Sequence, residues 1–225
     1  MAHKELVKDY IERIKFQNNE KGRLVEFRPC FFYCPKLDEM LLMQKQIHPY
    51  SKVSNIYIYT MLKKDAINNI KLSKMSPIER QEFFKTHMDD FYIYSDDHIA
   101  RMSSYIQTHD DFNFLLPEKV NRLSVLDVDS IYRKKGIAKE LITELKSETI
   151  NNNLHKITAR MSPLDSYNVT LDDLAIIYKH LGFDVSYTYY KEKDIKMNLN
   201  TLPKTPYPTS FTNYDFKGDT QVLIR

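Results

Sequence analysis

The sequence VDSIYRKKGIA, residues 128–138, is the stretch that decides the fold. An apolar run precedes it, containing Leu123, Val125, Leu126 and Val128, and this run predicts a short buried strand. An amphipathic helix is predicted to follow it, because apolar residues recur at helical spacing at Ile137, Ala138, Leu141, Ile142 and Leu145. The predicted order is therefore a strand, a basic loop with one glycine, and a helix.

This order suits the binding of an anion. The first backbone N–H groups of a helix have no intrahelical partner, and the helix dipole adds partial positive charge there. Gly136 lacks a Cβ, so a ligand can approach its backbone closely. Arg133, Lys134 and Lys135 add formal positive charge. Taken alone, the pattern fits an ordinary solvated strand–helix turn equally well.

A second run, YKHLGF at residues 178–183, adds to the pattern. Alternating apolar residues predict a strand over 155–161. A helix is predicted to follow, with one apolar face formed by Leu171, Leu174, Ala175, Tyr178 and Leu181. Gly182 stands where a left-handed helix terminator is expected. Strands are predicted over 183–190 and 195–199, and a hairpin of two strands over 91–94 and 99–106.

These motifs resemble those of the GNAT superfamily of acyl-CoA N-acyltransferases, over roughly residues 91–199. The family pattern Gln/Arg-x-x-Gly-x-Gly/Ala is met by Arg133, Gly136 and Ala138. Its preceding Val-x-Pro-x-Tyr-Arg is met by residues 128–133, with Ser130 in place of the proline, and Tyr-x-x-x-Gly-Phe is met by residues 178–183. The sequence departs from the family in having Leu171 where an Asn is common, with Asn168 offset, and no acid at 121–123.

The resemblance implies an α/β (α+β) fold: a mixed, mostly antiparallel central sheet with flanking helices and a splayed strand pair that binds acyl-CoA. The splayed strands should be those at 123–128 and 155–161. Acetyl-CoA is the implied co-substrate, and no metal is expected. The implied cofactor-binding residues are Leu126, Val128, Arg133, Lys134, Lys135, Gly136, Ile137 and Ala138. The loop would hold the pyrophosphate, residues 126–128 would pair with the pantetheine arm, and a backbone N–H near Val128 would polarise the acetyl carbonyl.

The resemblance also makes Tyr178 the general acid that protonates the leaving thiolate. The alternative is that Tyr178 is a core aromatic on an apolar helix face. Asp127 is the candidate catalytic base, while Asp129, water or no dedicated base remain open. His155 and His180 are weaker candidates, and His180 is expected to face solvent because it lies off the face of Tyr178.

The overall composition is ordinary and argues against several classes of protein. A hydrophobic fraction of 42% with 28% charged residues predicts a soluble globular chain, and no apolar run is long enough to span a membrane. The first residues show no secretory signal, so cytoplasm is the expected location. A net charge of +3 does not indicate nucleic acid. Cys30 and Cys34 have no second ligand pair at metal spacing, which argues against zinc.

The N-terminal region, residues 1–90, is expected to form the acceptor side of the same domain, before a core at 91–200. Helices are predicted over 4–17 and 37–46, and a capping box at Ser76 predicts another toward His87. Pro29 predicts that the strand over 24–33 lies at a sheet edge. Aromatic residues in 48–90 either line an acceptor pocket or merely pack: Tyr50, Tyr57, Tyr59, Phe83 and Phe84. The Pro- and aromatic-rich segment 201–225 is expected to pack on the body or on a partner, and a homodimer is left open.

Three functions remain at this stage. The first is transfer of an acetyl group from acetyl-CoA to an amine of a small molecule or metabolite. The second is the same reaction on a macromolecular amine, in a protein or an aminoacyl-tRNA. The third is a non-catalytic GNAT-like module that binds a partner. A shared fold does not decide among them, because acceptor specificity resides in loops and added elements.

Overall fold

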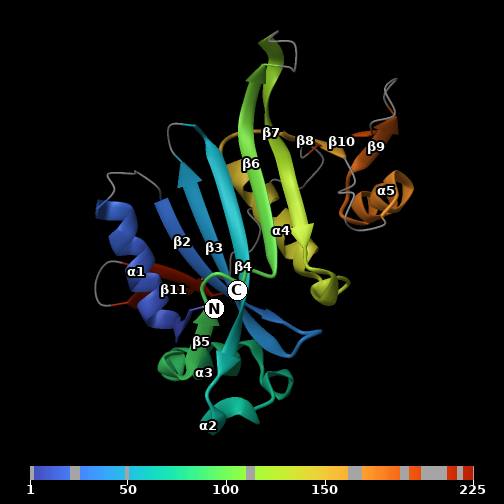
Figure 1. The fold of residues 1–225 in the computed structure, drawn as a ribbon. Coiled ribbons are helices and arrows are strands. Elements are labelled where there is room, and N and C mark those ends of the chain that lie inside the picture. Colours follow the sequence, from blue (N-terminus) through green and yellow to red (C-terminus); the bar gives the residue numbers. More distant parts are fainter. Residues whose placement is uncertain are drawn as a thin grey trace. The chain divides into compact units, whose positions relative to one another are not determined.

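The computed structural model describes residues 3–20, 26–48, 51–109, 115–161, 169–187, 193–198, 212–216 and 220–224. They form a mixed α/β fold whose strands pair mostly antiparallel and are flanked by helices (Figure 1), which confirms the predicted fold class. The chain divides into two compact units. The first comprises Met1–Arg101, Asp127–Ile137 and Pro208–Arg225, and the second comprises Met102–Leu126 and Ala138–Tyr207.

The first unit is built on a sheet with the strand order β11-β12-β2-β3-β4. These strands are β2 (Glu26–Cys34), β3 (Glu39–His48), β4 (Val53–Lys63), β11 (Thr212–Phe216) and β12 (Thr220–Ile224). All neighbours are antiparallel except β12 and β2, which run parallel. β5 (Phe91–Tyr94) pairs antiparallel with the end of β4 and with β1 (Lys4–Leu6).

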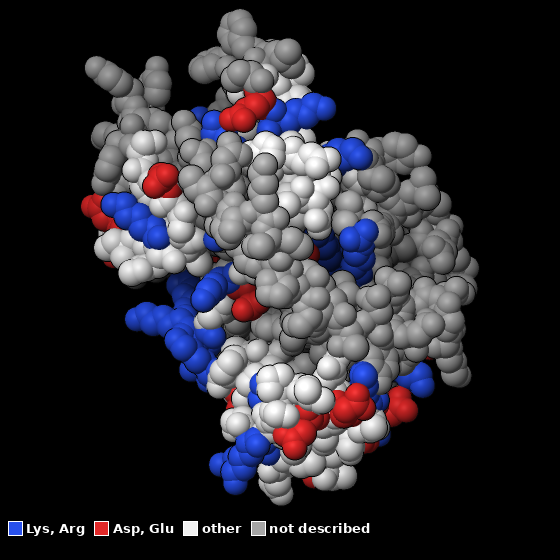
Figure 2. All heavy atoms as spheres, turned by 180° about the vertical axis from the view of Figure 1, so that it is seen from behind, with Lys and Arg blue, Asp and Glu red and all other residues white. Residues whose placement is uncertain are grey.

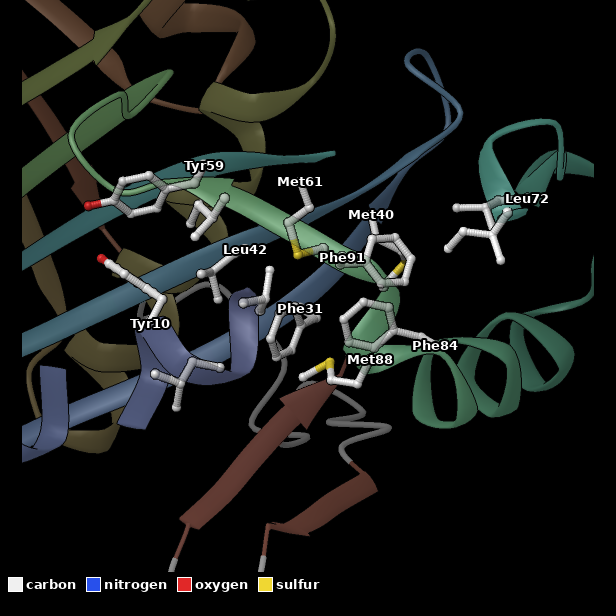
Figure 3. Packing of buried hydrophobic residues seen from close by; sticks show 14 residues of the cluster. Tyr10, Phe31, Met40, Leu42, Tyr59, Met61, Leu72, Phe84, Met88 and Phe91 are labelled. Atoms are coloured by element: carbon white, nitrogen blue, oxygen red, sulfur yellow. The ribbon is translucent and has the colours of Figure 1, made fainter. Parts of the chain in front are cut away.

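Helices of the first unit supply the other side of its core. They are α1 (Val7–Glu20), α2 (Asp65–Asn68) and α3 (Pro77–Thr86), with 3-10 turns η1 (Leu72–Lys74) and η2 (Met88–Asp90). Phe84 of α3 lies between Phe31 and Phe91, at ring-centroid distances of 4.6 and 5.0 Å (Figure 3). Burying each such ring contributes about 1.5–3 kcal/mol. Phe84 is therefore a core residue and not part of a pocket wall.

The start of α3 confirms the predicted capping box. The Ser76 hydroxyl accepts a hydrogen bond from the Glu79 N–H, and the Glu79 carboxylate accepts one from the Ser76 N–H at 2.7 Å. Pro77 occupies the first helical position, where its missing N–H costs nothing. This start was predictable because the signal is local to four residues.

Several predictions for the N-terminal half were wrong. Residues 37–46 form no helix: 37 and 38 lie in a turn, and 39–46 belong to β3, because Leu41 and its neighbours are buried on both faces between β2 and β4. β2 is not an edge strand, since β12 pairs with it at Cys30 and Phe31, immediately beyond Pro29. β5 forms no hairpin with the strand that follows it, because it pairs with β1 and β4 instead. The helix predicted from residue 4 begins only at Val7, because the residues before it form β1.

The second unit has the strand order β6-β7-β8-β10-β9. Its elements are β6 (Ala100–His109), β7 (Leu115–Val128), α4 (Ile137–Asn151), β8 (Lys156–Met161), α5 (Leu171–His180), β9 (Asp184–Tyr187) and β10 (Lys193–Asn198). β7 and β8 are parallel, whereas β8, β10 and β9 pair antiparallel. Part of the predicted turn at 191–194 lies outside the described residues. Three other parts lie wholly outside them: Tyr50, Asn168 and residues 201–211.

The helices of the second unit match the predicted periodicity. The inner stripe of α4 is at most 1% exposed at Ile137, Leu141, Ile142 and Leu145. α5 begins at a capping box between Thr170 and Asp173 and is terminated by Gly182 at φ +91°, as expected of a left-handed terminator. None of the helices in the described part of the chain combines the length and apolar character needed to cross a bilayer.

Candidate active site

The parallel strands β7 and β8 separate part-way along their length. Their described pairing runs through Asn121↔Ile157 and Arg122↔Thr158 and ends at Leu123↔Ala159. β7 nevertheless continues to Val128. The other edge of β8 is paired with β10 from Lys156 to Met161. Within the part of the chain that the structure describes, no pairing of β7 with β8 extends beyond Leu123, as in a splayed pair.

A short, tightly bonded loop follows β7 within the first unit. The 3-10 turn η3 (Ser130–Tyr132) reverses the chain, with the Tyr132 N–H donating to the Asp129 carbonyl at 2.9 Å. Arg133 then reaches back, and its Nε donates to the Val128 carbonyl at 2.9 Å. This bond makes Arg133 a brace between the loop and the end of β7, in addition to any charge that it presents to a ligand.

Gly136 holds a backbone conformation that other residues rarely adopt. Its φ is +96°, and Lys134 is also left-handed at +61°. A Cβ built on Gly136 would meet no protein atom within 4 Å. The requirement for glycine is therefore conformational, and the space above its Cα is open. α4 starts at the next residue, so its unpartnered first amides lie beside this space.

The turn between β2 and β3 fixes the orientation of the loop. Lys36 Nζ donates to the Lys134 carbonyl at 2.9 Å, and Cys34 Sγ lies 3.5 Å from the Lys135 carbonyl oxygen. In a planar trans peptide the C=O and the following N–H point in opposite directions. The amides of Lys135 and Gly136 consequently point away from this turn, as an anion-binding loop requires. Neither contact is predictable from the sequence, because each joins residues about a hundred positions apart and leaves no local pattern.

The charge of this segment is wholly positive. From Ser130 to Lys139 the sequence contains Arg133, Lys134, Lys135 and Lys139 but no acid. Lys134 is exposed and Lys135 is half-buried. Elsewhere, the face shown in Figure 2 mixes Lys and Arg groups with Asp and Glu groups. A local cluster of bases at a helix N-terminus is suited to a phosphate rather than to a long polyanion.

Two acidic residues, Asp127 and Asp129, lie at the end of β7. Asp127 Oδ2 lies 3.9 Å from Arg101 Nε, and Arg101 is half exposed. The Asp129 side chain is exposed, and its backbone N–H donates to the Ile99 carbonyl at 2.9 Å.

Tyr178 belongs to the second unit, on α5. The Phe183 N–H donates to the Tyr178 carbonyl at 3.0 Å, and the two rings meet edge to face at 5.5 Å and 84°. Burial raises the pKa of Tyr178 to about 12, so its phenol is neutral at physiological pH. His180 is exposed, as predicted, and so is His155.

Comparison with known proteins gives likeness at the level of structure only. No family profile matches the chain, and no curated protein matches it. Solved structures to which it is similar include several acetyltransferases, one of them described as a GNAT-family protein. A GNAT-family protein from Desulfovibrio desulfuricans is 15% identical, with 56% of this chain and 83% of that chain covered and a TM-score of 0.36.

Two further structures are named for acetylation of proteins or for a bisubstrate complex. The ribosomal-protein-S5-alanine acetyltransferase of Vibrio fischeri is 14% identical, covering 68% of this chain and 66% of that chain with a TM-score of 0.38. NAA60 of Arabidopsis thaliana, in complex with a bisubstrate analogue, is 13% identical, covering 64% and 74% with a TM-score of 0.37.

Proposed function

We propose that this chain is an acetyl-CoA-dependent N-acetyltransferase that transfers an acetyl group directly to the amine of a small molecule or metabolite. The observation that carries the proposal is the end of β7. There, a parallel strand pair separates after Leu123, and the chain then passes through a left-handed Gly136 into the N-terminus of the 15-residue helix α4. An open strand edge beside an anion-binding loop fits a ligand with an amide-containing arm and a pyrophosphate.

In this proposal the two ends of acetyl-CoA use different groups. The pyrophosphate accepts hydrogen bonds from the amides of residues 134–138, with charge from Lys134 and Lys135. The pantetheine arm pairs with the open edge of β7 from residue 124 to Val128, in the manner of an added strand. A backbone N–H near Val128 polarises the thioester carbonyl as charge develops on its oxygen.

The proposed reaction forms one N–C bond and breaks one C–S bond. The neutral amine attacks the thioester carbonyl, and the thiolate of CoA leaves. Tyr178 is proposed as the acid that gives this thiolate its proton, which is supported by the neutrality of its buried phenol. Asp127, the base suggested by the sequence, is supported less well because Arg101 lies beside it.

The test is release of free CoA thiol from acetyl-CoA by the purified chain, across a panel of small primary amines. Thiol release that depends on an amine, with the acetylated amine found by mass spectrometry, would support the proposal. The matched variant is Tyr178→Phe, which keeps the ring against Phe183 but removes the acid, and the expected loss in kcat is about 10²–10⁴-fold. If label from acetyl-CoA passes only to protein or tRNA in a lysate, the acceptor is a macromolecular amine and not a small one. Binding of acetyl-CoA without any transfer would favour a non-catalytic module.

A further inference from the structure

We propose that Arg133 makes the site selective for acyl donors that carry a pyrophosphate, because its guanidinium occupies the Val128 carbonyl until a pyrophosphate draws it away. The inference rests on the proposed function and deepens it by naming the residue that distinguishes acetyl-CoA from a shorter acyl-pantetheine. All the contacts that carry it join residues of the first unit, so it depends on no placement of one unit against the other.

The peptide between Val128 and Asp129 is held at both of its polar groups. The Asp129 N–H donates to the Ile99 carbonyl at 2.9 Å. The Val128 carbonyl accepts from Arg133 Nε, also at 2.9 Å. Both distances are those of well-formed hydrogen bonds. The end of β7 is therefore fixed by a backbone group on one side and by a guanidinium on the other.

The planarity of this peptide decides where the Val128 carbonyl points. In a planar trans peptide the C=O and the following N–H point in opposite directions. The Asp129 N–H points toward Ile99, the residue just before β6, so the Val128 carbonyl points to the other edge of β7. In the sheet order β7 lies between β6 and β8. Arg133 Nε thus bonds β7 at the edge that the proposed function gives to the pantetheine arm.

The guanidinium and the pantetheine arm compete for this carbonyl. A chain that joins a sheet as an added strand donates its amide N–H groups to the carbonyls of the strand beside it. At Val128 such an amide would approach where Arg133 Nε now lies, 2.9 Å from the oxygen. A guanidinium is a planar group, larger than the amide N–H that would replace it. The arm can therefore pair with Val128 only after Arg133 has turned away.

A pyrophosphate is a group that can draw the guanidinium away. Arg133 begins the basic run that ends at Lys135 and leads through the left-handed Gly136 into the N-terminus of α4. A guanidinium binds phosphate through two parallel charge-assisted hydrogen bonds, each roughly twice as strong as a bond between neutral groups. Exchange of the Val128 carbonyl for a phosphate is therefore favourable once a pyrophosphate lies at this loop.

The difference between two donors follows from this exchange. A ligand shifts an equilibrium only by the difference in its affinity for the two states. In one state Arg133 holds the Val128 carbonyl, and in the other it faces the loop. Acetyl-CoA stabilises the second state through its pyrophosphate. S-acetylpantetheine has the same acyl arm but no phosphate, so it must displace Arg133 without any compensating contact. Arg133 therefore favours the first donor and opposes the second.

The experiment measures the Kd of each donor in the wild type and in two variants. Calorimetry serves for acetyl-CoA, and saturation-transfer NMR serves for the weaker S-acetylpantetheine. Arg133→Met removes every guanidinium N–H but keeps an unbranched side chain. Lys134→Met is the matched control, because it removes one positive charge from the same loop at an exposed residue outside the contact at Val128.

The two donors should respond to Arg133→Met in opposite directions. Acetyl-CoA should bind about 10–100-fold more weakly, because a charge-assisted phosphate contact is lost. S-acetylpantetheine should bind about 2–10-fold more tightly, because the Val128 carbonyl becomes free for its arm. Lys134→Met should weaken acetyl-CoA and leave S-acetylpantetheine as in the wild type. If Arg133 were only a structural brace, its loss would weaken both donors.

Inorganic pyrophosphate tests the same competition in the unmodified chain. It supplies the phosphates without the acyl arm, so it should tighten S-acetylpantetheine binding about 2–10-fold by turning Arg133 toward the loop. Linkage requires S-acetylpantetheine to tighten pyrophosphate binding by the same factor. The coupling should vanish in Arg133→Met and persist in Lys134→Met.

Two results would overturn the role of Arg133 while leaving the acetyltransferase intact. One is S-acetylpantetheine binding that is unchanged or weaker in Arg133→Met, and the other is a wild type in which pyrophosphate does not tighten it. If Arg133→Met does not fold, as judged by circular dichroism, the coupling in the wild type decides.

Failure of the proposed function has a different signature. A wild type that binds no acetyl-CoA would remove that function and this inference together. A wild type that shows the coupling but releases no thiol with any amine would support the role of Arg133 and contradict only the transfer.

Discussion

Replacing Gly136 by alanine should separate backbone strain from ligand binding. At φ +96° an alanine costs roughly 1–2 kcal/mol, although its Cβ would meet no protein atom within 4 Å. For a chain of this size each kcal/mol lowers Tm by about 2–4 °C, so the expected fall is about 2–8 °C. Gly182→Ala is the matched control, because Gly182 has nearly the same φ, +91°, at the end of α5.

Acetyl-CoA should distinguish the two variants. At a hundredfold excess over its Kd, a ligand stabilises the native state by about 2.7 kcal/mol, which corresponds to about 5–11 °C. An alanine that relaxes the loop at residue 136 misdirects the amides beside it, and the loss of one amide–phosphate hydrogen bond costs about 1.5–3 kcal/mol, or at least about tenfold in affinity. The stabilisation of Gly136→Ala at the same concentration then falls to about 1.4 kcal/mol or less.

The assay is thermal unfolding of the wild type and both variants, with and without acetyl-CoA. Both variants should unfold at lower temperature, and only Gly136→Ala should lose half or more of the ligand-induced shift. The reasoning is refuted if Gly136→Ala keeps the full shift, or if Gly182→Ala loses as much of it as Gly136→Ala does.

Three further outcomes are expected. Lys36→Met should weaken acetyl-CoA binding about 2–10-fold in calorimetry, because it frees a loop carbonyl, whereas the exposed Lys71→Met should not. Leu141→Ala on the buried face of α4 should lower the free energy of unfolding by about 2–5 kcal/mol in urea titrations, while Ile78→Ala, at a side chain 73% exposed, should change it by less than about 0.5 kcal/mol. Tyr178 has a pKa of about 12 in the folded chain, against about 10 in the unfolded chain. Its contribution to the free energy of unfolding is therefore complete below pH 10 and is lost as pH rises through 12. The free energy of unfolding should decline less steeply over that range in Tyr178→Phe than in the wild type.

The sequence predicts the segments whose physics is local. The strand–loop–helix order around Gly136 follows from periodicity and one glycine, and the structure has that order. The Ser76 capping box and the terminator at Gly182 likewise depend on only a few neighbouring residues. In each case the local preference agrees with the tertiary packing, so nothing overrides it.

The sequence fails where pairing with distant strands decides the conformation. The apolar run in β3 fits a helix as well as a strand, because a strand buried on both faces shows no alternation. Ile99 joins β4 to the end of β7, because its N–H bonds the Ile58 carbonyl and its carbonyl bonds the Asp129 N–H. The hydrogen bond from Lys36 to the Lys134 carbonyl in the loop before α4 is equally non-local. Contacts between distant residues leave no periodic pattern in the sequence.

Amide hydrogen exchange of the wild type, with and without acetyl-CoA, tests the central claim most directly. The account predicts that acetyl-CoA slows exchange at the open edge of β7, residues 124–128, and in the loop and first turn of α4, residues 134–138. The buried middle of α4 around Leu141 should change little, because it is already protected. Saturation with acetyl-CoA that leaves both segments unchanged would contradict the account.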